Sequence, residues 1–204
     1  MPIIVRETKT TLPPMAEGIH ICRCYGIVDI GEQYSEKYGK YARKGVILWE
    51  VSDERYTDRD GVDRPRTISR EYALSLNEKS GLRKMLEQWR SKKFTAEELD
   101  GFDLQRLLGL ACQIQIVNTE RNGNLYPDMT GILAVPKGTE VPAQENENIY
   151  FDWDGKSAAE LTEAMAVLPE WIQKKIRDSR SFAELESSPA VDGFMPAEED
   201  DLPF

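Results

Sequence analysis

The chain is poor in the residues on which most catalytic and metal sites depend. Its 204 residues include one histidine, His20, and three cysteines, Cys22, Cys24 and Cys112. A tetrahedral zinc site needs about four Cys, His or carboxylate ligands, so the cysteines are interpreted as core residues. The single histidine weakens every catalytic scheme that depends on histidine. An odd number of cysteines without framework spacing is typical of a reducing compartment.

Long apolar runs and a secretion signal are missing as well. No run of about 18 apolar residues occurs, so no membrane span is expected. The first residues, Met1 to Glu7, lack the basic stretch and apolar block of a signal peptide. The sequence has no P-loop, no G-x-G-x-x-G after a strand, no H-E-x-x-H and no G-x-S-x-G. We therefore expect a cytoplasmic protein that is not an enzyme and uses no cofactor or metal.

Positive charge is scarce in one part of the chain only. The net charge of −10 is unexpected for a protein that binds a polyanion. Residues 1–137 carry 21 Lys and Arg against 20 Asp and Glu, whereas residues 138–204 carry 5 against 16. Residues 34–93 carry 15 basic against 10 acidic residues. The middle of the chain is therefore basic enough to contact phosphates, and the acidity belongs to the C-terminal third.

Alternating apolar and polar residues predict a mainly β protein. Runs typical of strands occupy residues 18–30, 46–51, 65–74, 111–117 and 126–135. Gly26, within the first run, predicts a bulge or sharp bend. Alternation through that run puts two sets of side chains on opposite faces: Cys22, Cys24, Val28 and Ile30 against Ile21, Arg23, Tyr25 and Ile27.

Two helices and one tight turn complete the predicted barrel. A helix fits residues 79–91, capped by Asn77 or Ser80, and a shorter one fits residues 97–108. The pair Asn122-Gly123 predicts a hairpin turn. The expected order along the chain is three strands, a helical insertion and two further strands. This is the order of the OB-fold, a five-stranded Greek-key barrel that binds oligonucleotides. An SH3-like barrel or a small sandwich fits the strand count nearly as well.

The composition divides the chain into four parts. We expect an N-terminal arm at residues 1–17 and the OB-fold domain that binds single-stranded DNA at residues 18–137. A linker with short helices is expected at residues 138–186, and a disordered acidic tail at residues 187–204. The short helices are predicted at residues 157–165 and 169–179. They could pack on the barrel, pair with a second subunit in a homo-oligomer, or bind a partner.

The basic middle of the chain interleaves cations with tyrosines. Binding of single strands without sequence preference needs cations for the phosphates and aromatic faces for the bases. The loop residues Tyr38 and Tyr41 are the preferred stacking platforms, whereas Trp49 and Trp89 are expected in the core. Arg83, Lys84 and Arg90 are interpreted as solvated helix residues. The predicted binding residues are Arg23, Tyr25, Tyr38, Tyr41, Arg43, Lys44, Arg55, Tyr56, Arg64, Arg66, Arg70 and Tyr72.

The chain ends on four carboxylates, Glu198 to Asp201, followed by Leu202-Pro203-Phe204. Such an end suits capture by an apolar pocket with a basic rim, although a solubilising tail is the simpler alternative. The tip resembles that of the bacterial single-stranded DNA-binding protein (SSB) family. Residues 1–137 show no residue-level match to the barrels of that family, so the chain looks more like a divergent SSB encoded by a phage or prophage.

The resemblance implies a function and a class of partners. SSB proteins coat and protect single-stranded DNA during DNA replication, recombination and repair, and they recruit other replication and repair proteins through this tip. The resemblance therefore assigns partner binding to the last five residues, Asp200, Asp201, Leu202, Pro203 and Phe204. Bound DNA would also free the acidic tail from competition for the same basic groove.

Other functions are compatible with the same features. A recombination annealing protein or a non-catalytic recruitment adaptor could use the same tail. A metal-dependent nuclease is the alternative from another class, because four carboxylates cluster in one predicted loop: Asp53, Asp58, Asp60 and Asp63.

Overall fold

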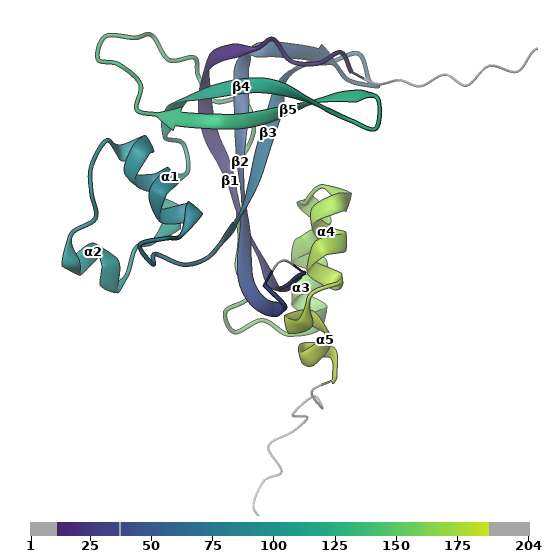
Figure 1. The fold of residues 1–204 in the computed structure, drawn as a ribbon. Coiled ribbons are helices and arrows are strands. Elements are labelled where there is room, and N and C mark those ends of the chain that lie inside the picture. Colours follow the sequence, from purple (N-terminus) through teal and green to yellow (C-terminus); the bar gives the residue numbers. More distant parts are fainter. Residues whose placement is uncertain (1–11, 37, 188–204) are drawn as a thin grey trace, which may run out of the picture.

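Two long antiparallel strands form the spine of the fold (Figure 1). They are β1 (Gly18–Ser35) and β2 (Lys40–Thr57), each of 18 residues. The computed structural model describes residues 12–36 and 38–187. Both strands continue through segments expected to be loops, since residues 32–35 pair with residues 40–43 across the hairpin.

Three further antiparallel strands extend this hairpin into a curved sheet. They are β3 (Asp63–Ala73), β4 (Ala111–Arg121) and β5 (Asn124–Leu133), and the order across the sheet is β3-β2-β1-β4-β5. The two ends of this order approach each other, because Arg70 Nη1 on β3 donates a hydrogen bond of 2.7 Å to the Met129 carbonyl on β5. The protein is mainly β with a few helices, and its sheet is barrel-like.

The bulge expected at Gly26 is confirmed. The pairing of β1 with β2 shifts register between Cys24 and Gly26. An extra residue turns the following side chains over, so Ile27 packs with Cys22 and Cys24, whereas Val28 packs on the other side of the sheet. The predicted alternation was therefore wrong beyond Gly26, since it assumed an uninterrupted period of two.

Strand β1 consequently serves two hydrophobic cores. The barrel core contains Trp49 and Trp89, both expected to be buried, and is covered by α1 (Gly81–Arg90) and η1 (Leu104–Leu107). The short helix α2 (Ala96–Asp100) lies on the same side of the sheet as α1 (Figure 1). Ser80 caps α1 by accepting a hydrogen bond from the Arg83 amide.

The second core lies between the β1–β2 hairpin and the C-terminal helices. Those helices are α3 (Ala158–Ala164), η2 (Met165–Val167), α4 (Glu170–Arg177) and α5 (Arg180–Ser187), beside the lower part of the hairpin in Figure 1. Leu161, Ile172 and Ile176 are fully buried there against Val28 and Val46. Packing on the sheet is thus the arrangement that these helices adopt, and α5 extends them further than expected.

Two smaller elements complete the description. Asn122 and Gly123 have φ angles of 53° and 76°, as a tight hairpin turn between β4 and β5 requires, so that prediction is confirmed. A short strand that was not expected, β6 (Ile149–Phe151), pairs parallel to β1.

The described chain contains no helix of the length and apolarity that a bilayer crossing demands. The tail residues predicted to bind partners lie outside the described residues.

Replacement of Gly26 by alanine is expected to destabilise the protein. A Cβ atom at this position would lie 2.5 Å from Leu48 Cδ1 and 3.0 Å from Leu48 Cβ, closer than packed carbon atoms approach. We expect Gly26→Ala to lower the free energy of unfolding by about 1–3 kcal/mol in chemical denaturation. Gly131→Ala is the matched control, because its nearest neighbour would be Gln115 Oε1 at 3.6 Å. Equal stability of the two variants would contradict the close approach.

Candidate nucleic-acid interface

Three tyrosines gather at the end of the β1–β2 hairpin, and we call Tyr34, Tyr38 and Tyr41 the tyrosine tip. Their exposed fractions are 54%, 67% and 46%. Tyr34 and Tyr41 face each other across the two strands, with ring centroids 5.2 Å apart in an edge-to-face arrangement. Because the strands continue to the turn, the rings stand on a paired hairpin, and the preferred platforms Tyr38 and Tyr41 are open to solvent.

A cation from the C-terminal helices reaches the tyrosine tip. The Arg180 guanidinium lies 5.3 Å from the Tyr41 ring centroid, and it also forms an ion pair of 2.6 Å with Glu184. No pattern in the sequence indicated this contact, because the two residues lie far apart in the chain. The packing of α5 on the hairpin brings them together.

Most of the cations predicted to contact phosphates form internal ion pairs. A phosphate would have to compete with the carboxylate in each pair, although exposed pairs are individually weak, at about 0–1 kcal/mol. Five of the seven predicted cations are paired in this way: Arg43 with Asp29, Lys44 with Glu71, Arg55 with Asp63 and Glu145, Arg64 with Asp58, and Arg66 with Glu54.

Residues 136–148, which include the start of the expected linker, are bonded to the sheet, and we call them the strap. Its anchor is Glu50 on β2, a carboxylate that is only 1% exposed. Glu50 accepts hydrogen bonds from the backbone amides of Glu145 (3.1 Å) and Asn146 (2.9 Å), and from Asn146 Nδ2 (2.8 Å). Displacing the strap would leave a buried carboxylate without donors, which is costly, so the strap is a fixed part of the fold.

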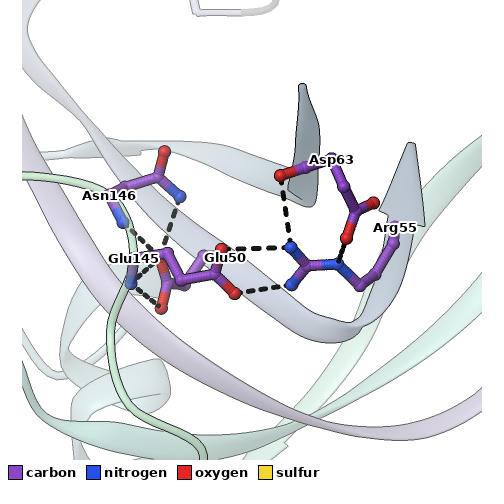
Figure 2. Close-up of polar contacts among 5 residues, drawn as sticks. All are labelled: Glu50, Arg55, Asp63, Glu145 and Asn146. Atoms are coloured by element: carbon purple, nitrogen blue, oxygen red, sulfur yellow. Dashed lines mark hydrogen bonds and ion pairs between the residues drawn. The ribbon is translucent and has the colours of Figure 1, made fainter. Parts of the chain in front are cut away.

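Arg55 holds the same strap from the exposed side (Figure 2). Its guanidinium donates to both carboxylate oxygens of Glu145, at 2.5 Å and 3.1 Å, and to Asp63 at 2.6 Å. The hydrogen bond from Arg55 holds the pKa of Glu145 below its ordinary value. Arg55 is thus engaged on both sides of its guanidinium and offers few free donors to a phosphate.

The two predicted residues on β1 are covered by this arrangement. Arg23 donates to the Pro142 carbonyl of the strap at 2.7 Å and to the Gly109 carbonyl at 2.8 Å. Tyr25 is buried in the second core, and this burial raises the pKa of its hydroxyl. Tyr25 therefore supports the fold away from any open surface, whereas Arg23 is half-buried and its guanidinium is occupied by the two carbonyls.

The residues predicted around the β2–β3 connection lie together but are tied to acidic partners. Tyr56 pairs in register with Arg64, and Arg66 donates to the Pro13 carbonyl at 2.6 Å. The hydrogen bond from Arg64 lowers the pKa of Asp58.

Three of the four aspartates of the nuclease alternative, all but Asp60, are engaged with separate partners. Asp53 contacts His20 at 3.0 Å, Asp58 contacts Arg64, and Asp63 contacts Arg55. Within residues 12–36 and 38–187, no group of three or more His, Cys, Asp or Glu side chains is placed to hold a metal ion.

Arg70 and Tyr72 lie together on β3 at the seam between β3 and β5. They line one hollow of about 260 Å³ with residues of α1 and β5, and the Arg70 guanidinium is 5.8 Å from the Tyr72 ring centroid. Arg70 contacts a backbone carbonyl there rather than a carboxylate. Arg70 is exposed at this hollow, whereas Tyr72, predicted to contact DNA, is 7% exposed and belongs to the barrel core.

Glu71 joins the sheet to the C-terminal helices. It accepts hydrogen bonds of 2.7 Å from Lys44 on β2 and from Lys175 on α4. Burial acts to raise the pKa of Glu71, but the hydrogen bonds from the two lysines outweigh it and leave the pKa below its ordinary value. The carboxylate form is therefore the one that binds α4 to the sheet.

Replacement of Glu71 by glutamine is expected to cost stability in a pH-dependent way. A lowered folded-state pKa stabilises the protein above the ordinary value of 4.5, and this contribution is lost as the pH falls through the folded-state pKa. We expect Glu71→Gln to lower the free energy of unfolding by about 1 kcal/mol at pH 7. The difference from the wild type should decrease progressively as the pH of denaturation is lowered below 4.5. A difference that is independent of pH would contradict the ion-pair role.

The described residues thus leave two open parts of the expected interface, the tyrosine tip and the seam at Arg70. No model of a known protein family matches the chain, and no curated protein shows significant similarity to it.

Proposed function

We propose that this protein binds single-stranded DNA without sequence preference and coats it during DNA replication, recombination or repair. The observation that carries the proposal is the tyrosine tip, where three rings are exposed on a paired hairpin. Bases of any identity can stack on such rings, and each stacked base contributes about 1–3 kcal/mol. Aromatic residues are seldom left open to solvent in such a group without a binding role.

The proposal includes an OB-fold for residues 18–137. Its support is the strand order β3-β2-β1-β4-β5, with β3 approaching β5 and with α1 inserted between β3 and β4. Proteins of this fold bind oligonucleotides with the face of strands two and three and with the loops after strands one and four. The tyrosine tip occupies the first of these loops. The strap crosses the sheet at Glu50, so the end of the hairpin carries more of the proposed binding than the middle of the sheet.

Recruitment of replication and repair proteins is the second half of the proposal. It depends on Asp200, Asp201, Leu202, Pro203 and Phe204, which lie outside the described residues. Its support is the resemblance of this tip to that of SSB proteins and the concentration of acidic residues in the C-terminal third. An acidic segment is drawn to a basic rim, and a terminal aromatic residue suits an apolar pocket.

Removal of the tyrosine rings tests the binding activity. We expect the double variant Tyr38→Ala/Tyr41→Ala to bind a labelled oligo-dT more weakly by about 1–3 kcal/mol per lost platform, measured by fluorescence anisotropy. The matched control is Tyr38→Phe/Tyr41→Phe, which keeps the rings and should bind nearly as the wild type does. Unchanged affinity of the alanine variant would contradict stacking at the tip. Absence of any binding by the wild type would contradict the function itself.

Deletion of Leu202 to Phe204 tests the separation of the two activities. The shortened chain should bind oligo-dT with unchanged affinity, because the removed residues are apolar and carry no cation. It should no longer retain bacterial replication and repair proteins in an affinity experiment in which the full chain retains them. Loss of DNA binding on deletion would show that the two activities are not separate.

A further inference from the structure

A continuous groove runs along the seam between β3 and β5 and onto α1, and we call it the seam groove. It consists of three adjoining hollows. The first and second share Arg70 and Met129, and the second and third share Lys84 and Gln88. The outermost part, on α1, is lined by Lys92 and Lys93. The groove therefore connects β3, β5 and one face of α1.

The seam groove is lined by more basic than acidic residues. Its two acidic residues are already engaged, since Asp128 pairs with Arg121 at 2.5 Å and Glu87 pairs with Lys93 at 2.6 Å. Arg70 donates only to a backbone carbonyl among its described contacts. Lys84 is exposed, and no carboxylate of the described chain forms an ion pair with it. An anion in the groove would meet Lys84, which has no ion-pair partner among the described residues, and Arg70, which attracts Asp128 without forming an ion pair with it.

The first turn of α1 carries positive side chains, whereas negative charge stabilises the start of a helix. Its first four residues are Gly81, Leu82, Arg83 and Lys84, with no acidic side chain among them. Cations in the first turn oppose the helix dipole, whereas an anion there is favourable. Gly81 leaves this end open, because a Cβ atom would meet only the Tyr72 ring, at 3.8 Å. The helix start therefore favours a bound anion.

Tyr72 forms the inner wall of the same hollow. The residue is 7% exposed, and its ring lies beside Arg70 and Gly81. Its side chain belongs to the barrel core with Cys112, and its hydroxyl is buried. Tyr72 therefore shapes the hollow, while the contacts to an anion come from Arg70, Lys84 and the start of α1.

We propose that the seam groove binds the phosphates of the same single strand whose bases stack on the tyrosine tip, an inference that rests on the proposed function. Arg70 and Lys84 provide the cations, and the start of α1 provides backbone N–H groups. The two sites are close enough to share one strand. Tyr72 pairs with Gly45 on β2, and Tyr41 lies four residues further along β2, about 13 Å away.

Charge reversal at Lys84 tests the groove without harming the fold. We expect Lys84→Glu to bind oligo-dT about 5- to 10-fold more weakly at low salt, with a difference that shrinks as salt rises. The slope of log affinity against log salt should fall by about 0.7, the value for one lost phosphate contact on a single strand. The melting temperature should stay unchanged or rise, because a glutamate suits the first turn of a helix. If Lys84 served the fold alone, its replacement would not weaken DNA binding while leaving the melting temperature unchanged.

Lys137→Glu is the matched control, because Lys137 is exposed and lines none of the three hollows. It makes the same change in net charge. Equal affinities of the two variants would overturn the groove, and so would an Arg70→Gln variant that binds as the wild type does. A wild-type chain that fails to bind oligo-dT would overturn the proposed function and the groove together. Binding that depends on the tyrosine tip but not on Lys84 would overturn the groove alone.

Discussion

The register shift at Gly26 is the constraint on which the rest of the structure depends. It turns the side chains of β1 over in mid-strand, so one strand contributes Cys22 and Cys24 to the barrel core and Val28 and Ile30 to the core beneath the C-terminal helices. The space for the bulge exists because residue 26 has no side chain against Leu48. Without this shift, the lower half of the hairpin would present the wrong face to α3 and α4.

The second core in turn determines which surfaces stay open. Because α4 and α5 pack on the hairpin, Arg180 reaches Tyr41, and Lys175 joins Lys44 on Glu71. The strap is fixed by the buried Glu50, and its Pro142 carbonyl occupies the guanidinium of the half-buried Arg23. Among the predicted binding residues, Tyr38 and Tyr41 stay open at the hairpin end, and Arg70 stays exposed at the β3–β5 seam. The proposed path of a single strand follows these two regions.

The local features of the fold could be predicted from the sequence because they depend on neighbouring residues. Asn122-Gly123 fixes a tight turn, Ser80 caps α1, and the apolar stripe through Leu82, Met85, Leu86 and Trp89 places that helix on the barrel. The exposure of Tyr38 and Tyr41 also followed from their polar surroundings. The two long strands were underestimated, because their ends are polar and are stabilised by pairing with each other.

The candidate site was predicted less completely, and the reason is physical. The sequence identifies which residues carry charge but not which opposite charge lies beside them, and ion pairs such as Arg55 with Glu145 join residues far apart in the chain. The strand β6 and the anchoring role of Glu50 were equally invisible, since both depend on how the strap returns to the sheet. Lys84 was interpreted as a solvated residue because only the fold places it in a groove with Arg70.

The sequence by itself determined the mainly β character, the helix between the third and fourth strands, the Asn-Gly turn and the acidic C-terminal third. These follow from short-range periodicity, turn chemistry and composition, which act along the chain. Only the tertiary structure decided which cations are neutralised, which tyrosines are buried, and where the C-terminal helices pack. Those outcomes depend on contacts across large sequence separations, where burial and charge pairing are settled by the whole fold.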